Sequence, residues 1–542
     1  MAGTVAPDRG RLTTSTPNRL PRWLVPALGV GPACFIAAFY ALPILRLLGR
    51  VVHVGDIHTV LSSSGLGRVV WFTLWQAVVS TAITVMVGCV PAYLMARFRF
   101  RGHRLLMALI TVPFMLPTVV VGAAFLAVLP DRWHNTAIAV VTAHVFFNIA
   151  VVVRIVGSMW ATIPTDLTGA ARTLGASPRQ VLTTVVFPLL RPALLAASSV
   201  VFLFTFTSYG VVRVLGGVRN ATIEVEVARR ATLMGDVRGA AVLSVMQLIL
   251  LGGVVWWSAR WQRQSAVTIT SGRSAHSTVS RQRRRAVRST AVAVGLAMAI
   301  PLTALLVNSF RVGSQWTFAA WSGLGHTEVR PGVSLGTEPL QAIATSLRSC
   351  VVATIISLVV GVATSLVVRL SRRVGRVLDV GITLPLGTSA VTIGLGLLIT
   401  FDHSPFNWRG QWWMVPVGHA LIATPFVVRT LLPVLRSFPP EQRQAALTLG
   451  ASPLRAWWHM EARRLARPLL TGAGFAAAIS LGEFGASTFL TRSGHDTLPL
   501  AIAHLLARTG AIPRAQGFAL ATILMLVCAA LVVAVDPSRR DS

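Results

Sequence analysis

One carboxylate stands where acidic residues are rare. Glu483 lies in Ser480–Gly485, inside an apolar stretch long enough to cross a membrane. An acid at membrane depth is costly unless it is paired or faces water, so Glu483 is a candidate on a pathway for a polar solute. A cationic solute suits it electrostatically. The alternative is a structural carboxylate that pairs with an Arg or His of a neighbouring span. Ser208 and Tyr209 occupy the equivalent place in the first half and are further pathway candidates.

Two histidines recur at matching positions, His144 and His419, and Asn148 follows the first by one helical turn. We include His144 and Asn148 among the pathway candidates. A lone His in a helical bundle is more often a hydrogen-bonding residue than a metal ligand. The four cysteines show no C-x-x-C or Cys/His spacing, so neither a metal site nor a disulfide is predicted. We find no His/Glu metal pair, no convincing Ser/His/Asp set and no paired carboxylates at membrane depth, so catalytic residues are not predicted.

The chain contains no lysine; all of its positive charge is arginine. A phosphate-binding P-loop needs a Lys after its glycines to reach the β- and γ-phosphates. If ATP drives this protein, the ATP and its Mg²⁺ are therefore expected on a separate ATPase subunit. The chain itself is predicted to bind no cofactor.

The composition is that of a multi-span membrane protein. Of 542 residues, 54% are hydrophobic and 12% are charged, with a mean hydropathy of +0.68; soluble domains carry about 25% charged residues. The net charge of +32 raises the possibility of nucleic-acid binding. Arg, however, falls in short clusters between apolar runs, a pattern typical of cytoplasmic loops beside anionic lipid, so membrane lipid and not nucleic acid is the expected partner.

Apolar runs predict an all-α, polytopic protein of about twelve transmembrane helices, arranged as two tandem parallel repeats of six. We divide the chain into an N-terminal tail (1–23), a first repeat (24–257, core from 69), a basic linker (258–288), a second repeat (289–535, core from 345) and a C-terminal tail (536–542). The apolar runs of the first half lie near Leu24–Leu48, Val69–Ala96, Leu105–Val128, Thr136–Val156, Ala193–Val212 and Gly239–Trp257. Those of the second half lie near Ser289–Ser309, Thr345–Leu370, Val377–Thr400, Trp412–Leu435, Leu470–Leu490 and Gly517–Val535.

Arginine clusters set the orientation. They occupy the N-terminal tail, the loop after the second span, the linker and the matching loop at 369–376, all on one side if the spans alternate. That side is predicted to be cytoplasmic, with both termini on it and the plasma membrane as the location. Most acids fall in the opposite loops: Asp56, Asp131, Glu224, Glu226, Asp236, Glu328, Glu338 and Asp496.

The two halves repeat one another in sequence. Ile110–Pro113 matches Ile382–Pro385, and Leu174–Pro178 matches Leu449–Pro453, in the same order and at nearly constant offset. Because each half has an even number of spans, both share one orientation, and a pseudo-two-fold axis along the membrane normal is expected.

The matching loops after the fourth span of each half predict two helices joined by a sharp elbow. A Gly in the left-handed conformation ends the first helix, and a Ser then caps the next helix with Pro at its first position. Paired alanines leave room for another surface to approach. The residues are Ala170, Ala171, Gly175, Ser177, Pro178 and Pro188 in the first copy, and Ala445, Ala446, Gly450, Ser452 and Pro453 in the second. An ordinary amphipathic interfacial helix is the alternative.

Both loops resemble the EAA motif of binding-protein-dependent ABC importer permeases, in which Glu-Ala-Ala is followed by a Gly and later by Ile-x-Leu-Pro. Gly169 and Gln444 stand where the motif has Glu, and Arg463 stands where the second copy would have Pro. In that family the loop is a coupling helix seated in a groove of the ATPase. The resemblance therefore implies docking mainly through the shape of the two elbows, with the second copy weaker.

The resemblance to fused two-domain permeases covers nearly the whole chain. Segments Phe72–Ala77, Ala143–Asn148 and Ala221–Glu226 are similar to the thiamine permease and its ferric-iron relatives. This implies import of thiamine or ferric iron, two copies of a cytoplasmic ABC ATPase, and a periplasmic or lipid-anchored substrate-binding protein. The alternative is an ion-coupled secondary transporter, which would be expected to carry more acids in its spans.

Overall fold

The structure, a computed structural model, describes residues 24–51, 62, 65–264, 281–325, 328–330, 333–334, 338–402, 404–408, 410–452, 455–456, 458–492 and 494–535. Both predicted tails and residues 265–280 of the predicted linker lie outside these ranges. Helices dominate, and the described strands form two short antiparallel hairpins, β1 (Arg311–Val312) with β2 (Gln315–Trp316) and β3 (Glu328–Arg330) with β4 (Val333–Ser334). The all-α fold class is therefore confirmed.

The helices of the first half are α1 (Leu24–Ile36), η1 (Ala37–Ala41), α2 (Leu42–Val51), α4 (Leu66–Arg97), α5 (His103–Met115), α6 (Thr118–Val128), η2 (Asp131–Trp133), α7 (Ala137–Thr162), α8 (Thr165–Thr173), α9 (Pro178–Gln180), η3 (Val181–Val186), α10 (Phe187–Phe206), α11 (Gly210–Leu215), α12 (Ile223–Thr232) and α13 (Val237–Gln264). Those of the second half are α14 (Arg281–Asn308), α15 (Ala319–Ser322), η4 (Gly323–Gly325), α16 (Pro339–Leu370), α17 (Arg372–Thr383), η5 (Leu384–Gly387), α18 (Ala390–Phe401), α19 (Met414–Ser437), α20 (Pro440–Thr448), η6 (Trp458–Ala462), α22 (Arg463–Gly482), α23 (Ser487–Leu490), α24 (Leu498–Ala507) and α25 (Ala511–Val535).

Ten helices of the described chain are long and apolar enough to cross a membrane, and the number rises to twelve if each of two bent pairs is one span. The bent pairs are α5 with α6, at 110°, and α17 with η5 and α18, at 106°. The sequence predicted a single run through each pair. Pro117 stands at the first break as the N-cap of α6, where its ring prevents α5 from continuing.

The two halves repeat element by element. Helices α4 and α16 have 32 residues each, α10 and α22 have 20, α8 and α20 have nine, and α12 and α24 have ten. A π-helical turn, η3 or η6, precedes α10 and α22 in the same way. This agreement confirms the tandem repeat that the sequence motifs predicted.

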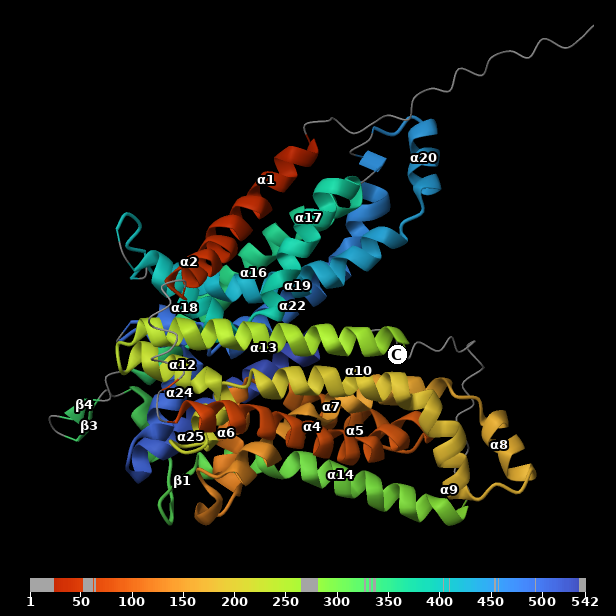
Figure 1. Cartoon of the computed structure of the whole chain (residues 1–542), viewed down its shortest axis with the longest axis horizontal. Helices are drawn as coiled ribbons and strands as arrows, with labels where there is room; N and C mark the ends of the chain where they lie inside the picture. The colour runs from red at the N-terminus through yellow and green to blue at the C-terminus, as the bar shows by residue number, and fades with distance from the viewer. Residues whose placement is uncertain are drawn as a thin grey trace, which may run out of the picture.

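The first span of each half packs on the other half. Helix α1 lies against α16 and α17, and α2 lies against α18. Helix α14 lies reciprocally along α5 and α6 of the first half (Figure 1). Each half therefore contributes its first span to the interface with the other half.

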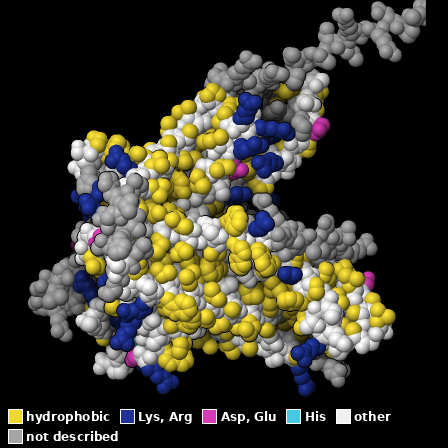
Figure 2. All heavy atoms as spheres, in the orientation of Figure 1, with side chains coloured by type: hydrophobic (Ala, Val, Ile, Leu, Met, Phe, Trp, Pro, Cys, Tyr) yellow, Lys and Arg dark blue, Asp and Glu magenta, His cyan; other side chains and the backbone are white. Residues whose placement is uncertain are grey.

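The molecule divides into two arms that diverge toward α8 and α20, which lie at their far ends (Figure 1). Figure 2 shows a notch between the arms on that side, and a broad hydrophobic surface over the middle of the lower arm. At the opposite end the arms meet through α12, which packs against both α18 and α23. The bundle is therefore closed at one end and open at the end that carries the elbows.

Candidate functional site

The fifth span of each half, which contains α10 or α22, is interrupted by a break in its helix. Helix α10 ends at Phe206, and Ser208 lies in the non-helical segment that follows, with Tyr209 as the N-cap of α11. Helix α22 ends at Gly482, and Glu483 is its C-cap. The predicted runs Ala193–Val212 and Leu470–Leu490 are thus each interrupted. Non-helical backbone is tolerated at membrane depth where protein surrounds it or where it lines a cavity.

Each break is held by the histidine that the sequence singled out. His144 Nε2 lies 2.8 Å from Ser208 Oγ, and its Nδ1 lies 3.4 Å from Ser80 Oγ. His419 Nδ1 and Nε2 each lie 2.8 Å from a serine hydroxyl, those of Ser480 and Ser487. Both rings are buried, and all four nitrogens have hydroxyl neighbours. The interpretation as hydrogen-bonding residues is therefore confirmed.

Asn148 lies one turn from His144 on α7 and donates through Nδ2 to the His144 carbonyl at 2.9 Å. Its Oδ1 is buried and accepts no hydrogen bond from the described residues. Within the described part of the chain, no group of three or more His, Cys, Asp or Glu side chains is placed to hold a metal ion. Asn148 therefore belongs to the polar surroundings of the first break.

Glu483 is held by backbone amides. Its Oε1 accepts a hydrogen bond of 2.6 Å from the Ala486 N–H, directly before α23. The side chain therefore caps the start of that short helix and fixes the break between α22 and α23. The sequence predicted that Glu483 lies within a continuous span. If the carboxylate was structural, it was expected to pair with an Arg or His of a neighbouring span. The structure places it at a helix break with backbone partners.

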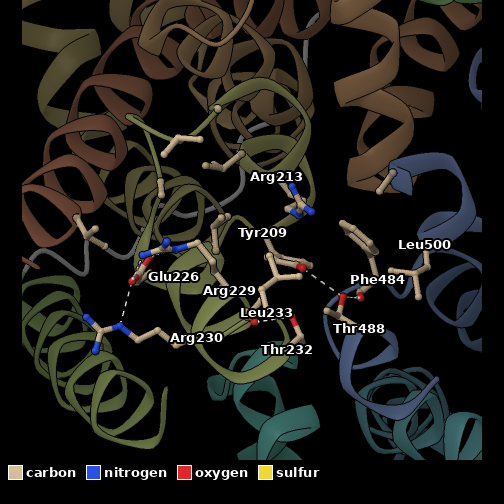
Figure 3. A pocket seen from close by; sticks show the side chains of 18 of the residues that line it. Tyr209, Arg213, Glu226, Arg229, Arg230, Thr232, Leu233, Phe484, Thr488 and Leu500 are labelled. Atoms are coloured by element: carbon tan, nitrogen blue, oxygen red, sulfur yellow. Dashed lines mark hydrogen bonds and ion pairs between the residues drawn. The ribbon is translucent and has the colours of Figure 1, made fainter. Parts of the chain in front are cut away.

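Tyr209 meets the second half across the interface between the arms. Its ring centroid lies 4.8 Å from that of Phe484, and its hydroxyl accepts a hydrogen bond of 3.2 Å from Thr488 Oγ1. Figure 3 shows Tyr209 and Thr488 pointing toward one another beside Phe484. The two breaks thus touch, and their aromatic side chains close the bundle at this level.

An open cavity of about 860 Å³ lies over this contact, at the end of the bundle opposite α8 and α20. We call it the vestibule. Tyr209, Phe484 and Thr488 line it, and arginines dominate its charged lining: Arg68, Arg213, Arg219, Arg229, Arg230, Arg492 and Arg508, against the acids Glu226 and Asp496.

Both vestibule acids are paired. Arg229 Nε and Arg230 Nε lie 2.8 Å and 3.0 Å from the carboxylate oxygens of Glu226, and Asp496 contacts His504 at 2.9 Å. Burial acts to raise the pKa of Glu226, but the hydrogen bonds from the two arginines outweigh it and hold that pKa below its usual value. The acid is therefore ionised at neutral pH, and the vestibule keeps a surplus of positive charge.

Sequence reasoning missed Glu224. It was assigned to a polar outer loop together with Glu226, but its side chain is fully buried on α12 and accepts a hydrogen bond from Gln247 on α13. Two residues apart on a helix, Glu224 and Glu226 face different sides: one faces the bundle interior and the other faces the vestibule. Because both glutamates belong to one short acidic segment, the sequence did not distinguish the one that faces the interior from the one that faces the vestibule.

The first elbow forms as predicted. Gly175 has φ of +86°, and the Ala176 and Gly175 N–H groups donate to the carbonyls of Ala171 and Arg172 at the end of α8. Ser177 caps α9 in a capping box with Gln180, and Pro178 occupies the first turn. Pro188 follows at the start of α10.

The second elbow has the same geometry. Gly450 has φ of +87°, and the Ala451 N–H donates to the Ala446 carbonyl. Ser452 Oγ accepts from the Arg455 N–H at 3.4 Å; Pro453 lies outside the described residues. Ala445 and Ala446 lie on α20, as Ala170 and Ala171 lie on α8.

Each elbow presents one leucine to the surroundings. Leu174 is 88% exposed and Leu449 is 87% exposed, directly before the two glycines. The repeat thus places the same exposed apolar side chain at equivalent positions of the two elbows.

The family model for the inner membrane component of binding-protein-dependent transport systems matches residues 84–268 and again residues 353–537. The chain belongs to this family. It is thus a fused ABC importer permease: a multi-pass membrane component with two tandem transporter domains, in a family of transport subunits.

Two named relatives resemble it over most of its length and a third over a part of it. The thiamine transport system permease protein ThiP of Salmonella typhimurium is 24% identical over 95% of this chain and 97% of its own. ThiP of Brucella abortus is 28% identical over 88% of this chain and 89% of its own. A probable sulfate transport system permease protein of Marchantia polymorpha is 32% identical over 26% of this chain and 53% of its own.

Proposed function

We propose that this permease carries a thiamine-type organic cation inward, driven by two copies of an ABC ATPase that dock on the elbows of α8 and α20. The paired elbows carry the proposal: two rigid helix turns, each with an exposed leucine, stand at the ends of the two arms. The chain binds no cofactor in this scheme, because ATP and Mg²⁺ belong to the ATPase.

Alternating access explains the shape of the bundle. The arms are separated at the elbow end and joined at the Tyr209–Phe484 contact, as an inward-facing importer requires. ATP binding would draw the two ATPases and both elbows together, close the notch and part the breaks at the opposite end. The elbow side, with both termini, is cytoplasmic in this scheme.

The positive charge of the vestibule favours delivery of the substrate by a substrate-binding protein over entry of the free solute. Its surplus of arginine would repel a free cation, whereas an acidic docking surface on a periplasmic or lipid-anchored protein would be attracted. A cationic solute then enters already bound to its carrier.

Cysteine cross-linking tests the docking. Leu174→Cys and Leu449→Cys, in a chain whose native cysteines are replaced by Ala, should each cross-link to a cysteine placed in the groove of the co-expressed ATPase. Leu233→Cys, exposed at the vestibule end, is the matched control. Cross-linking from neither elbow, or equally from Leu233→Cys, would contradict the proposal.

The substrate is tested by the ligand that copurifies with the binding protein. We expect thiamine, because the relatives that match nearly the whole chain are thiamine permeases by name. Ferric iron or another solute would overturn the substrate but leave the docking unaffected.

A further inference from the structure

Glu224 is a buried carboxylate to which the transport scheme gives no role. Its side chain is fully buried, and its Oε1 accepts a hydrogen bond from Gln247 Nε2. Its Oε2 is also buried and has no hydrogen-bond partner among the described residues. A buried acceptor left unpaired costs about 1–3 kcal/mol, and more when it is charged, so a fold keeps one only for a reason.

A second carboxylate approaches from the other half. Glu483 interacts electrostatically with Glu224, and it too is buried. Helix α12, which carries Glu224, packs against α23, whose first turn Glu483 caps. One acid therefore comes from each arm, and the distance between them must change when the arms move.

The groups around the two carboxylates are neutral or acidic. Ser389, Gln247 and the amides of Gly485 and Ala486 are their polar neighbours, and no described Arg or His is among the groups that act on either acid. Two buried carboxylates within electrostatic reach are not both ionised unless a cation lies between them. Glu483 is tied to backbone amides, whereas Glu224 Oε2 has no hydrogen-bond partner among the described residues and could accept one from a ligand once the site opens.

Aromatic rings complete the surroundings. Tyr209 interacts electrostatically with Glu224, and Phe484 directly follows Glu483 in the chain. The two rings, tilted by 34° with centroids 4.8 Å apart, line the vestibule, whereas neither acid does. Carboxylates beside aromatic faces are the groups that bind organic cations. When the Tyr209–Phe484 contact parts, both kinds of group become accessible together.

We propose that Glu224 and Glu483, with the rings of Tyr209 and Phe484, form a transient site for the positively charged ring of the translocated solute. This rests on the proposed import of an organic cation. The site is closed when the arms meet, and it forms as the breaks separate.

Charge selectivity in reconstituted vesicles tests the site. The permease, its ATPase and its binding protein would be supplied with thiamine or with a neutral analogue whose ring nitrogen is replaced by carbon. Glu224→Gln should lower thiamine uptake about tenfold, the value of one charge-assisted contact, and leave uptake of the neutral analogue unchanged. Glu224→Asp should preserve the preference for thiamine.

Glu226→Gln is the matched control, because it removes a carboxylate from the same helix but from the vestibule side. It should keep the wild-type ratio of thiamine to analogue uptake. An unchanged ratio in Glu224→Gln would overturn the site while leaving the transport function intact. Absence of thiamine uptake by the wild type would overturn the proposed function, and with it thiamine as the ligand of this site.

Carbodiimide labelling of the wild-type complex avoids any folding defect of a variant. The hydrophobic reagent should modify Glu224 when the ATPase and ATP part the breaks in the absence of substrate, and thiamine delivered by the binding protein should protect it. Equal modification of Glu224 with and without thiamine, read by mass spectrometry, would contradict the site.

Discussion

Buried polar side chains of this bundle gather where the fifth span of each half breaks, after α10 and after α22. His144 and His419 each bridge two serine hydroxyls there, and Glu483 caps the short helix after the second break. Backbone that leaves a helix inside a membrane needs such partners, because lipid supplies none. These residues therefore hold the breaks in place.

Removing one of these histidines should loosen the second break. In His419→Ala the Ser480 hydroxyl loses its ring partner and a buried space opens, so the free energy of unfolding should fall by about 1–3 kcal/mol. Thermal unfolding of the purified permease in detergent measures this. His459→Ala, at an exposed position, is the control. Equal midpoints for the two variants would contradict the bridging role.

The Tyr209 ring, more than its hydroxyl, should close the vestibule floor. Tyr209→Phe loses only the bond from Thr488, whereas Tyr209→Ala also removes the ring that packs against Phe484. We expect passive thiamine leak through vesicles without ATP for Tyr209→Ala, and little leak for Tyr209→Phe. Tyr93→Ala, near the elbow end of α4, is the control. A tight Tyr209→Ala permease would contradict this role.

At the scale of the elements, the elbows depend on two glycines with positive φ. An L-residue in this conformation costs about 1–2 kcal/mol, and a β-branched side chain is among the worst suited. No neighbouring atom lies within 4 Å of a Cβ added at Gly175 or Gly450, so only the backbone conformation opposes a substitution.

Gly175→Val and Gly450→Val should therefore misdirect the elbows without disturbing the bundle. We expect ATPase association and ATP-driven uptake to fall severalfold, with a thermal midpoint close to that of the wild type. Gly169→Val, at an open position with ordinary φ on α8, is the control for the first elbow. Full transport in both elbow variants would refute the coupling role.

The elbows were predictable from sequence because their chemistry is local: a glycine, a capping serine and a proline specify the turn without distant contacts. The repeat and the approximate spans were also predictable, from motif order and apolar length. The sharp bends of 110° and 106° were not, because an apolar run gives no direction and proline is tolerated in membrane helices. Glu224 was missed because burial on α12 depends on helices from both halves.

At the scale of the whole molecule, the two arms are tied together at one end and free at the other. Helix α1 packs on the second half and α14 packs on the first, so these two helices join the halves. Helices α8 and α20, by contrast, extend from separate arms (Figure 1). Motion at the elbows can therefore reach the vestibule floor without separating the halves.

The charge of the vestibule should govern docking of the binding protein. Arg213→Glu with Arg219→Glu should slow association about tenfold at low salt, and should weaken its dependence on ionic strength. Surface plasmon resonance with nanodisc-embedded permease measures both. Arg311→Glu, on the β1–β2 hairpin outside the vestibule, is the control. Equal effects of the double variant and the control would argue against docking there.

Import driven by a separate ATPase is tested by identifying the energy source of uptake. Vesicles containing the permease, its ATPase and its binding protein are assayed for thiamine uptake with ATP, without ATP, and with ATP plus an uncoupler. We expect uptake to require ATP and the ATPase and to persist with the uncoupler. Uptake that survives removal of ATP but collapses with the uncoupler would contradict it and indicate an ion-coupled carrier.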